Sequence, residues 1–132
     1  MATARCVLIV DDDAVSRRLA QVVFQKRGWS ADTVASGEQA LVHMAAHRYD
    51  VVLLDISLPG MTGLDVCQQM RADQRLRALQ VLAYTAHAYP EQQQRFLDGG
   101  FDAVLVKPLC VSALHEVIQA LTPCQDSAPP LS

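Results

Sequence analysis

The chain contains few aromatic residues, few charged residues and no long apolar run. Aromatic residues make up 5% and charged residues 19% of its 132 residues, whereas 51% are hydrophobic. This balance is typical of a globular domain and excludes an intrinsically disordered chain. No apolar run approaches the roughly 20 residues that a membrane-spanning helix needs, and residues 1–5 lack the pattern of a signal peptide. We therefore expect a cytoplasmic protein without membrane insertion.

Net charge and cysteine spacing argue against two further classes of binding site. The formal net charge is −3, so there is no basic footprint that indicates direct binding to nucleic acid. The four cysteines lack the spacing of metal ligands; they are Cys6, Cys67, Cys110 and Cys124. We interpret them as reduced thiols of a cytosolic protein rather than as a metal site or a disulfide framework.

Short apolar runs alternate with segments of helical periodicity along the chain. The runs predict strands over residues 6–10, 30–34, 51–54, 81–85 and 103–106. Strands that alternate with helices in this way predict an α/β fold with a parallel sheet covered by helices on both faces. The length suits one domain with one core. We place that domain at residues 1–121 and expect residues 122–132, which contain three prolines, to form a flexible tail or linker stub.

The same patterns predict details of the helices and turns. The first helix is expected to present an apolar stripe of Val15, Leu19, Val22 and Val23. Asp12 or Asp13 can cap the N-terminus of this helix. Residues 71–79 are irregular and rich in charge, which indicates a solvated turn. Tyr84 is interpreted as a core residue with its hydroxyl at a rim.

The central apolar run, residues 51–54, ends in a carboxylate. It leads directly into Asp55, and Pro59-Gly60 then break the chain. A short apolar run bounded by breakers predicts a strand that is buried on both faces. Asp55 then lies where this strand emerges, at the edge where ligands bind in open α/β sheets. The first strand ends in the same way, in Asp11-Asp12-Asp13, so two strands deliver carboxylates to one edge.

The residues that follow the strands indicate phosphate chemistry. The carboxylates of Asp11, Asp12 and Asp55 repel one another unless a cation joins them. Oxygen ligands without histidine or cysteine favour a hard ion, most naturally Mg²⁺. The last two strands end in Thr85 and Lys107, which add a hydroxyl donor and a positive charge. A cation, a lysine and a hydroxyl around a carboxylate describe a site for phosphoryl transfer with aspartate as the acceptor.

These residues occur in an order and spacing that resemble a known family. The matching pieces are Val10-Asp11-Asp12, Leu54-Asp55 with Pro59-Gly60 and Gly63, Thr85-Ala86, and Lys107-Pro108. Together they resemble the receiver domain of response regulators in bacterial two-component signalling, over residues 5–121. The resemblance implies a flavodoxin-like fold with strand order 2-1-3-4-5, which places the acidic cluster beside the switch point of the sheet.

The resemblance also implies a role for each residue of this edge. Asp55 would be phosphorylated from a sensor histidine kinase or a histidine phosphotransfer protein. The ligands of Mg²⁺ would be Asp11, Asp12, Asp55 and the backbone carbonyl of Ser57. Thr85 and Lys107 would bind phosphoryl oxygens, and Lys107-Pro108 would be a cis peptide. Phosphorylation would switch a partner-binding surface, which describes a signalling protein with slow self-hydrolysis rather than a turnover enzyme.

One position departs from the family pattern. Receivers commonly carry Tyr or Phe three residues before the lysine, and here that position is Val104. We therefore expect coupling to the output to run through the backbone after Thr85 and through Tyr89. Two further residues, Ser57 and His87, occupy positions that flank the path of the hydrolytic water in receivers. Both are candidates to set the lifetime of the acyl phosphate.

A phosphatase is the main alternative. Asp11-Asp12-Asp13-Ala14-Val15 fits the D-x-D-x-V signature of haloacid-dehalogenase-like phosphatases, with Asp11 as nucleophile and Asp13 as general acid. That family needs an acidic metal-binding pair after the lysine, where this chain offers Glu116 and Asp126, which are not suitably paired. The phosphatase interpretation would also leave Asp55 unexplained.

Two other classes have less support. A flavodoxin-like nucleotide binder would need a loop rich in Ser, Thr and Gly after the first strand, and the three aspartates found there would repel a phosphate. A pure interaction module that takes no phosphate has no positive support, because all the acceptor chemistry is present. The chain suits a stand-alone regulator, a part of a truncated multidomain protein and the receiver of a hybrid kinase, and Thr85-Ala86-His87-Ala88 resembles the last of these.

Overall fold

Strands and helices alternate along the whole described chain. The computed structural model describes residues 5–86, 89–107 and 111–121. The strands are β1 (Cys6–Val10), β2 (Ser30–Val34), β3 (Val51–Asp55), β4 (Gln80–Thr85) and β5 (Ala103–Val106). The helices are α1 (Ala14–Lys26), α2 (Gly37–Ala46), α3 (Gly63–Ala72), α4 (Pro90–Asp98) and α5 (Val111–Leu121). The predicted strands are thereby confirmed, with β3 and β4 each one residue longer than expected.

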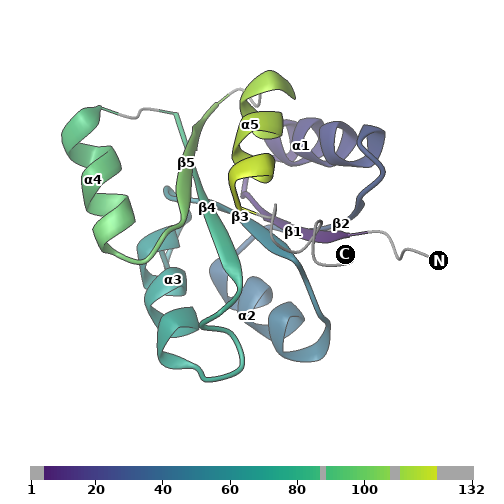
Figure 1. The fold of residues 1–132 in the computed structure, drawn as a ribbon. Coiled ribbons are helices and arrows are strands. Elements are labelled where there is room, and N and C mark those ends of the chain that lie inside the picture. Colours follow the sequence, from purple (N-terminus) through teal and green to yellow (C-terminus); the bar gives the residue numbers. More distant parts are fainter. Residues whose placement is uncertain (1–4, 87–88, 108–110, 122–132) are drawn as a thin grey trace, which may run out of the picture.

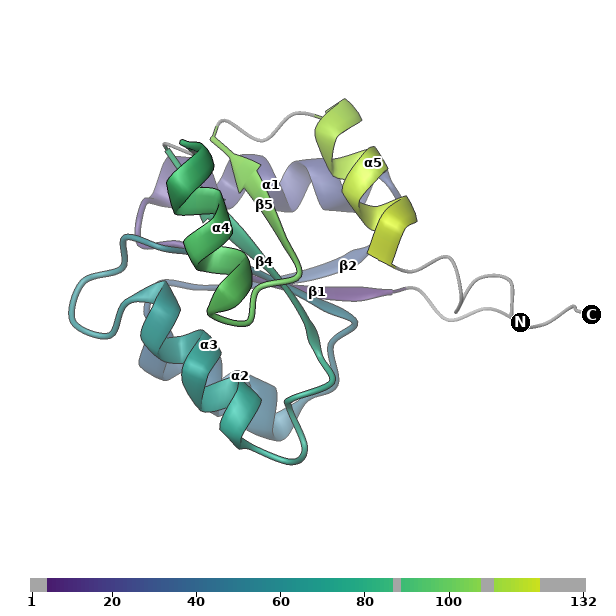
Figure 2. The same ribbon diagram turned by 60° about the vertical axis from the view of Figure 1, so that its left-hand side comes forward.

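The five strands form one parallel sheet between two layers of helices. Their order is β2-β1-β3-β4-β5, which confirms the predicted fold class. Helices α1 and α5 cover one face, and α2, α3 and α4 cover the other (Figures 1 and 2). The sheet reverses its winding next to β1 and β3, and this switch point is where ligands bind in folds of this kind.

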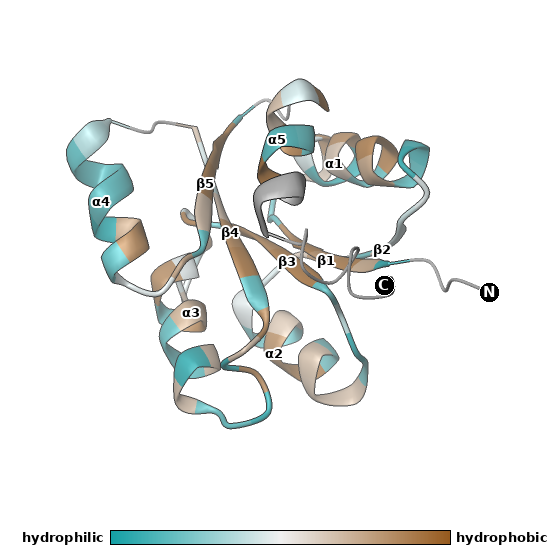
Figure 3. Cartoon of the chain, viewed as in Figure 1, coloured by the Kyte–Doolittle hydropathy of each residue, from teal (hydrophilic) through white to brown (hydrophobic). Residues whose placement is uncertain are grey.

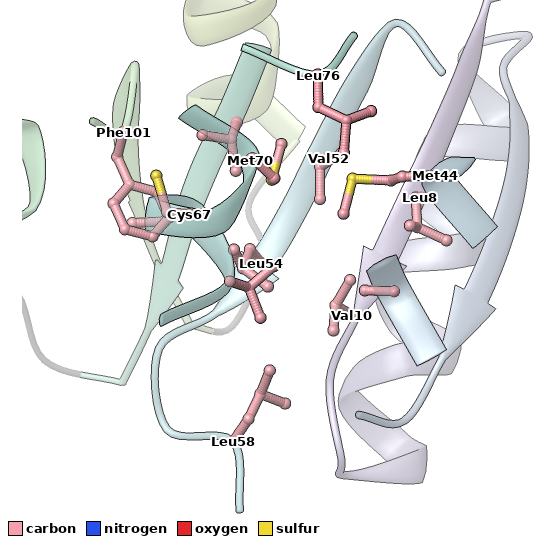
Figure 4. Close-up of a cluster of buried hydrophobic side chains, with 14 of the residues drawn as sticks. Leu8, Val10, Met44, Val52, Leu54, Leu58, Cys67, Met70, Leu76 and Phe101 are labelled. Atoms are coloured by element: carbon pink, nitrogen blue, oxygen red, sulfur yellow. The ribbon is translucent and has the colours of Figure 1, made fainter. Parts of the chain in front are cut away.

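Each face of the sheet has its own apolar core. All five residues of β3 are buried, as expected for a central parallel strand with both faces covered. Met44 of α2 and Met70 of α3 pack on one face (Figure 4), together with Phe96 of α4. Phe24 of α1 and Leu114 of α5 pack on the other face. Strands β1, β3, β4 and β5 are accordingly hydrophobic over most of their length (Figure 3).

The buried face of α1 agrees with the predicted stripe only in part. Val15 is 76% exposed and Leu19 is 40% exposed, whereas Ala20, Val23 and Phe24 are buried. Buried residues at spacings of three and four define the face that contacts the sheet. Val15 precedes Ala20 by five residues, which places it about 140° away around the helix. The helix was predicted correctly, and Val23 is buried and Val22 half-buried as expected, but Val15 and Leu19 are exposed and do not belong to the buried stripe.

Most of residues 71–79 are exposed, as predicted, but Arg71 at the end of α3 binds partners within the protein. Its Nε donates to the carbonyl of Gly100 at 2.9 Å, and its Nη1 donates to those of Arg77 and Leu79 at 2.7 and 2.8 Å. Its Nη2 forms an ion pair with Asp102 at 3.0 Å. One guanidinium thus joins the end of α3, the α3–β4 loop and the α4–β5 loop.

Across the ranges that the structure describes, none of the helices combines the length and the apolar character that crossing a bilayer requires. The expected tail, residues 122–132, lies outside the described residues. Cys6 and Cys67 are free thiols, and Cys110 and Cys124 are outside the described part of the chain.

Candidate functional site

The strand register brings the predicted residues to one edge of the sheet. Val10 of β1 lies opposite Leu54 of β3, so Asp11 and Asp55 leave adjacent strands side by side. Thr85, the last residue of β4, follows directly beyond the position opposite Asp55. Asp11 is 0%, Asp55 2% and Thr85 7% exposed. Among the described residues, these three make up the buried polar and charged set. Burial of polar groups is costly unless they have partners.

Lys107 bridges the two buried carboxylates. Its Nζ lies 3.0 Å from Asp55 Oδ2 and 3.1 Å from Asp11 Oδ2. Its backbone N–H donates to the carbonyl of Thr85 at 2.8 Å, which fixes the chain where it leaves β5. Burial alone would lower the pKa of the Lys107 ammonium, but its hydrogen bond to Asp55, its close contact with Asp11 and the charges of both carboxylates outweigh this effect and raise the pKa. The bridge therefore stays cationic at neutral pH.

Asp11 is held in a setting that disfavours its charge. Burial raises the pKa of its carboxyl group, and the neighbouring Asp55 acts in the same direction. The N–H of Asp13, which donates to Asp11 Oδ1 at 2.9 Å, lowers the pKa but does not cancel the effect of burial. Arg17 donates to the backbone carbonyl of Asp11 at 2.9 Å and steadies the turn into α1. A cation bound here would relieve the repulsion between the two carboxylates.

The loop after β3 is fixed at both ends. The N–H of Ser57 donates to Asp55 Oδ1 at 2.9 Å, and Leu58 is buried in the core beside it. The far end of the loop is the N-terminus of α3, where Thr62 and Asp65 form a capping box. Gly63, which follows Thr62, lies against the backbone of Asp55, since a Cβ at position 63 would come within 2.5 Å of the Asp55 carbonyl oxygen. The Asp55 carboxylate is therefore supported from the loop as well as from the sheet.

The acidic cluster has the donor set of a hard metal ion. Carboxylate oxygens of Asp11, Asp12 and Asp55 lie within 4.8 Å of one another, and Asp12 is the exposed member of the three. All the donors are oxygens, which suits Mg²⁺. Asp11 Oδ2 is buried and accepts no hydrogen bond of good geometry within the described residues, although Lys107 lies close to it. These residues fit a divalent cation, and the contribution of the Ser57 carbonyl stays a prediction.

Other predicted residues lie at or near this edge. Val104 is half-buried against the core beneath α4, and Tyr89 is 61% exposed where α4 begins. Asp13 caps α1 by accepting the N–H of Ser16, which confirms one of the two predicted caps. His87 and Pro108 fall outside the described residues, so the proposed cis peptide and the proposed role of His87 stay predictions.

Tyr84 contributes to the site in a way that the sequence analysis missed. Its ring is fully buried, which confirms a core residue but not the expected hydroxyl at a rim. Lys107 Nζ lies over this ring, 5.1 Å from the centroid. The two-residue period of strands carries the signal, because Leu82 and Tyr84 on β4 and Leu105 on β5 belong to one face of the sheet. Lys107 comes two residues after Leu105 and emerges on that same side.

Comparisons with known proteins agree on one family. The model of the response regulator receiver domain matches residues 7–119. The polar-differentiation response regulator DivK of Brucella ovis is 32% identical over 116 residues, which cover 88% of this chain and 94% of that protein.

Two solved structures resemble this one closely. The chemotaxis response regulator CheY4 of Vibrio cholerae has a TM-score of 0.83 and 30% identity, with 89% of this chain and 98% of that chain covered. The receiver domain of a sensor histidine kinase from Pseudomonas aeruginosa PAO1 has a TM-score of 0.81 and 27% identity, with 89% and 97% covered. That structure has a magnesium ion coordinated in its active site cleft.

These matches do not support the phosphatase alternative. Asp13, its expected general acid, instead caps α1, and Asp55, which that alternative leaves unexplained, lies at the centre of the cluster. The family match, the strand order and the acidic cluster at the switch point all agree. The chain is a member of the response regulator receiver domain family of two-component signalling.

Proposed function

We propose that Asp55 of this receiver domain accepts a phosphoryl group from the phosphohistidine of a sensor histidine kinase or a histidine phosphotransfer protein. The observation that carries the proposal is the position of Lys107 Nζ, 3.0 Å from Asp55 and 3.1 Å from Asp11 at the carboxyl edge of the sheet. A buried carboxylate that faces an ammonium group and two further carboxylates suits an anionic ligand only together with a cation. A phosphoryl group with Mg²⁺ meets both requirements.

In the proposed reaction, a carboxylate oxygen of Asp55 attacks the phosphorus of the donor. The new oxygen–phosphorus bond forms as the phosphorus–nitrogen bond breaks, and the bonding electron pair leaves on the imidazole nitrogen. Asp11, Asp12, Asp55 and the carbonyl of Ser57 would hold the Mg²⁺ ion, which supplies charge neutralisation for the phosphoryl oxygens when bound. Lys107 and Thr85 would bind the remaining phosphoryl oxygens, so the protein contributes mainly position and charge.

We further propose that the signal leaves the site through Thr85 and Tyr89. The aliphatic side chain of Val104 is half-buried and has no ring that could turn inward. Thr85 ends β4 at the site, and Tyr89 stands four residues later, where α4 begins. Movement of Thr85 toward a phosphoryl group would pull on the backbone between them. If the phosphorylated Thr85→Ala protein bound its partner like the phosphorylated wild type, this route would be wrong.

The proposed domain spans residues 1–121 and works as a switch in the cytoplasm. Receiver domains are regulatory, and here slow self-hydrolysis of the acyl phosphate would return the domain to its resting state. Ser57, which is exposed beside Asp55, and His87 are the residues proposed to tune this lifetime. The proposed partners are proteins, with no direct contact to nucleic acid.

Incubation with acetyl phosphate and Mg²⁺ tests the acceptor assignment. Intact-protein mass spectrometry should show one added phosphoryl group on the wild type and none on Asp55→Asn. Asp98→Asn is the matched control, because it removes one negative charge from the exposed surface of α4. Phosphorylation of Asp55→Asn but not of Asp11→Asn would overturn the assignment and favour the phosphatase chemistry.

A further inference from the structure

We propose that Tyr84 is a positioning residue for Lys107, whose ammonium group it holds against its ring face. Lys107 Nζ lies 5.1 Å from the ring centroid, within the range over which a cation is attracted to the negative face of an aromatic ring. The lysine side chain is 20% exposed, and the tyrosine is 0% exposed. The contact is therefore largely shielded from water, where attraction of this kind is strongest.

The ring is fixed by the sheet and by the core. Tyr84 is paired with Asp55 on one side and with Leu105 on the other. It belongs to the apolar cluster beneath α1 and α5, together with Phe24 and Leu114. Close packing of this kind restricts the ring to one orientation. A rigid ring under a long, flexible lysine side chain reduces the number of positions that the ammonium group can adopt.

Three groups thus define the position of the Lys107 ammonium. Asp11 and Asp55 contact it through carboxylate oxygens, and Tyr84 contacts it through its ring. On the proposed function, from which this inference follows, phosphorylation turns the Asp55 carboxylate into an acyl phosphate and so changes one of the two anionic contacts. The ring is the same before and after transfer. Tyr84 would therefore keep Lys107 aimed at the phosphoryl group while its carboxylate partner changes.

Two substitutions of Tyr84 separate the ring from mere core filling. Tyr84→Phe keeps the ring face, and Tyr84→Leu replaces it with an aliphatic side chain. Phe24→Leu is the matched control, because Phe24 is a buried aromatic residue of the same cluster that packs edge-on against Trp29, with ring centroids 5.4 Å apart. A core residue without a positioning role should lower stability as Phe24→Leu does and leave Lys107 unaffected.

Nuclear magnetic resonance reads the contact directly, because the chain has two lysines, Lys26 and Lys107. Labelling with lysine that carries carbon-13 at Cε gives one signal from each, and exposed Lys26 serves as the internal reference. We expect the Lys107 methylene protons to be displaced upfield by the ring in wild type, Tyr84→Phe and Phe24→Leu. In Tyr84→Leu the displacement should be lost. Identical Lys107 shifts in wild type and Tyr84→Leu would overturn the contact.

Phosphorylation kinetics then test the role. With acetyl phosphate and Mg²⁺, we expect the rate for Tyr84→Leu to fall about 3- to 10-fold, from the size of a shielded cation–ring attraction. Tyr84→Phe and Phe24→Leu should react at the wild-type rate. A wild-type rate in Tyr84→Leu would overturn the positioning role while the proposed function stands. A wild type that takes no phosphate would overturn the proposed function, and the resonance of Lys107 would still decide the contact.

A cooperative urea transition, followed by the fluorescence of buried Trp29, verifies that each variant is folded; in Phe24→Leu the transition and not the emission itself is compared, because Phe24 contacts Trp29. If Tyr84→Leu does not fold, Tyr84→Met fills the space with a flexible side chain that has no ring. The same two outcomes then apply to it: loss of the displaced Lys107 signal with a slower rate supports the proposal, and wild-type values of both refute it.

Discussion

Replacing Gly63 with alanine should disturb Asp55, the proposed acceptor, through the backbone alone. Gly63 is the first residue of α3. A Cβ at this position would lie 2.5 Å from the carbonyl oxygen of Asp55, 2.9 Å from Cα of Ile56 and 3.1 Å from the carbonyl carbon of Asp55. All three are backbone atoms, so no side chain can rotate away to make room. Either the end of β3 or the start of α3 has to move.

The size of the effect follows from these distances. The shortest contact must lengthen by at least about 0.5 Å to reach the 3.0 Å below which real Cβ atoms essentially never approach other atoms. Forcing an extra methyl group into a packed site costs about 1–3 kcal/mol of unfolding free energy. Alanine has the better helix propensity, by up to about 1 kcal/mol, which offsets part of this cost. We expect a net loss of about 1–2 kcal/mol, and slower phosphorylation because the reaction depends on the placement of Asp55.

Urea denaturation and the acetyl phosphate assay measure the two effects on Gly63→Ala. Two other glycines serve as controls. Gly99→Ala meets its nearest atom, the carbonyl oxygen of Arg95, at 3.3 Å and should therefore cost less than Gly63→Ala. Gly60→Ala meets nothing within 4 Å but has a φ of +72°, so it carries backbone strain without a collision. If Gly63→Ala matched Gly99→Ala in unfolding free energy and the wild type in phosphorylation rate, the close approach of α3 to Asp55 would affect neither quantity and the reasoning would be refuted.

Three further predictions concern the frame around the site. Arg71→Met should lower the unfolding free energy in urea by about 2–4 kcal/mol, because carbonyls such as those of Gly100 and Leu79 lose a charged donor; an unchanged value would contradict this. Thr62→Ala should cost about 1 kcal/mol and Thr62→Ser little, since serine keeps the capping oxygen. The N–H of Arg75 holds the pKa of Asp73 below its ordinary value. The charged Asp73 carboxylate therefore stabilises the fold above about pH 4, and this contribution is lost as the pH falls through the lowered pKa. Asp73→Asn should make the unfolding free energy in urea depend less on pH in that range. An unchanged pH dependence would refute the assignment.

The edge residues could be predicted because they follow strands. Asp55 and Lys107 come directly after apolar runs, and the ends of parallel strands meet at one edge whatever the detailed packing. The family resemblance added the strand order, which the apolar runs alone do not determine. By contrast, the rotation of α1 depends on which residues contact the sheet. Val15 fits an apolar stripe by spacing and still lies on the exposed side.

Contacts between distant loops could not be predicted from the sequence. Arg71 stands in a charged stretch that resembles solvated surface, and its partners include Gly100 and Asp102, 29 and 31 residues away. Its other acceptors are backbone carbonyls, which carry no signature in residue type. The position of Tyr84 could be predicted in part, because its place on the same face as Leu82 follows from the two-residue period of the strand. Its contact with Lys107 depends on the course of the chain after β5.

The alternation of side chains along the strands separates two tasks of the site. Lys107 meets Tyr84 on the face of the sheet that α1 and α5 cover. Because neighbours along a strand point to opposite faces, Thr85 belongs to the face of Ala83 and Val104, which α2, α3 and α4 cover. In the proposed mechanism the first face holds the charge that accepts the phosphoryl group, and the second transmits its presence. A valine at position 104 alters the second task and leaves the first intact, so the acceptor chemistry and an unusual output are compatible in one chain.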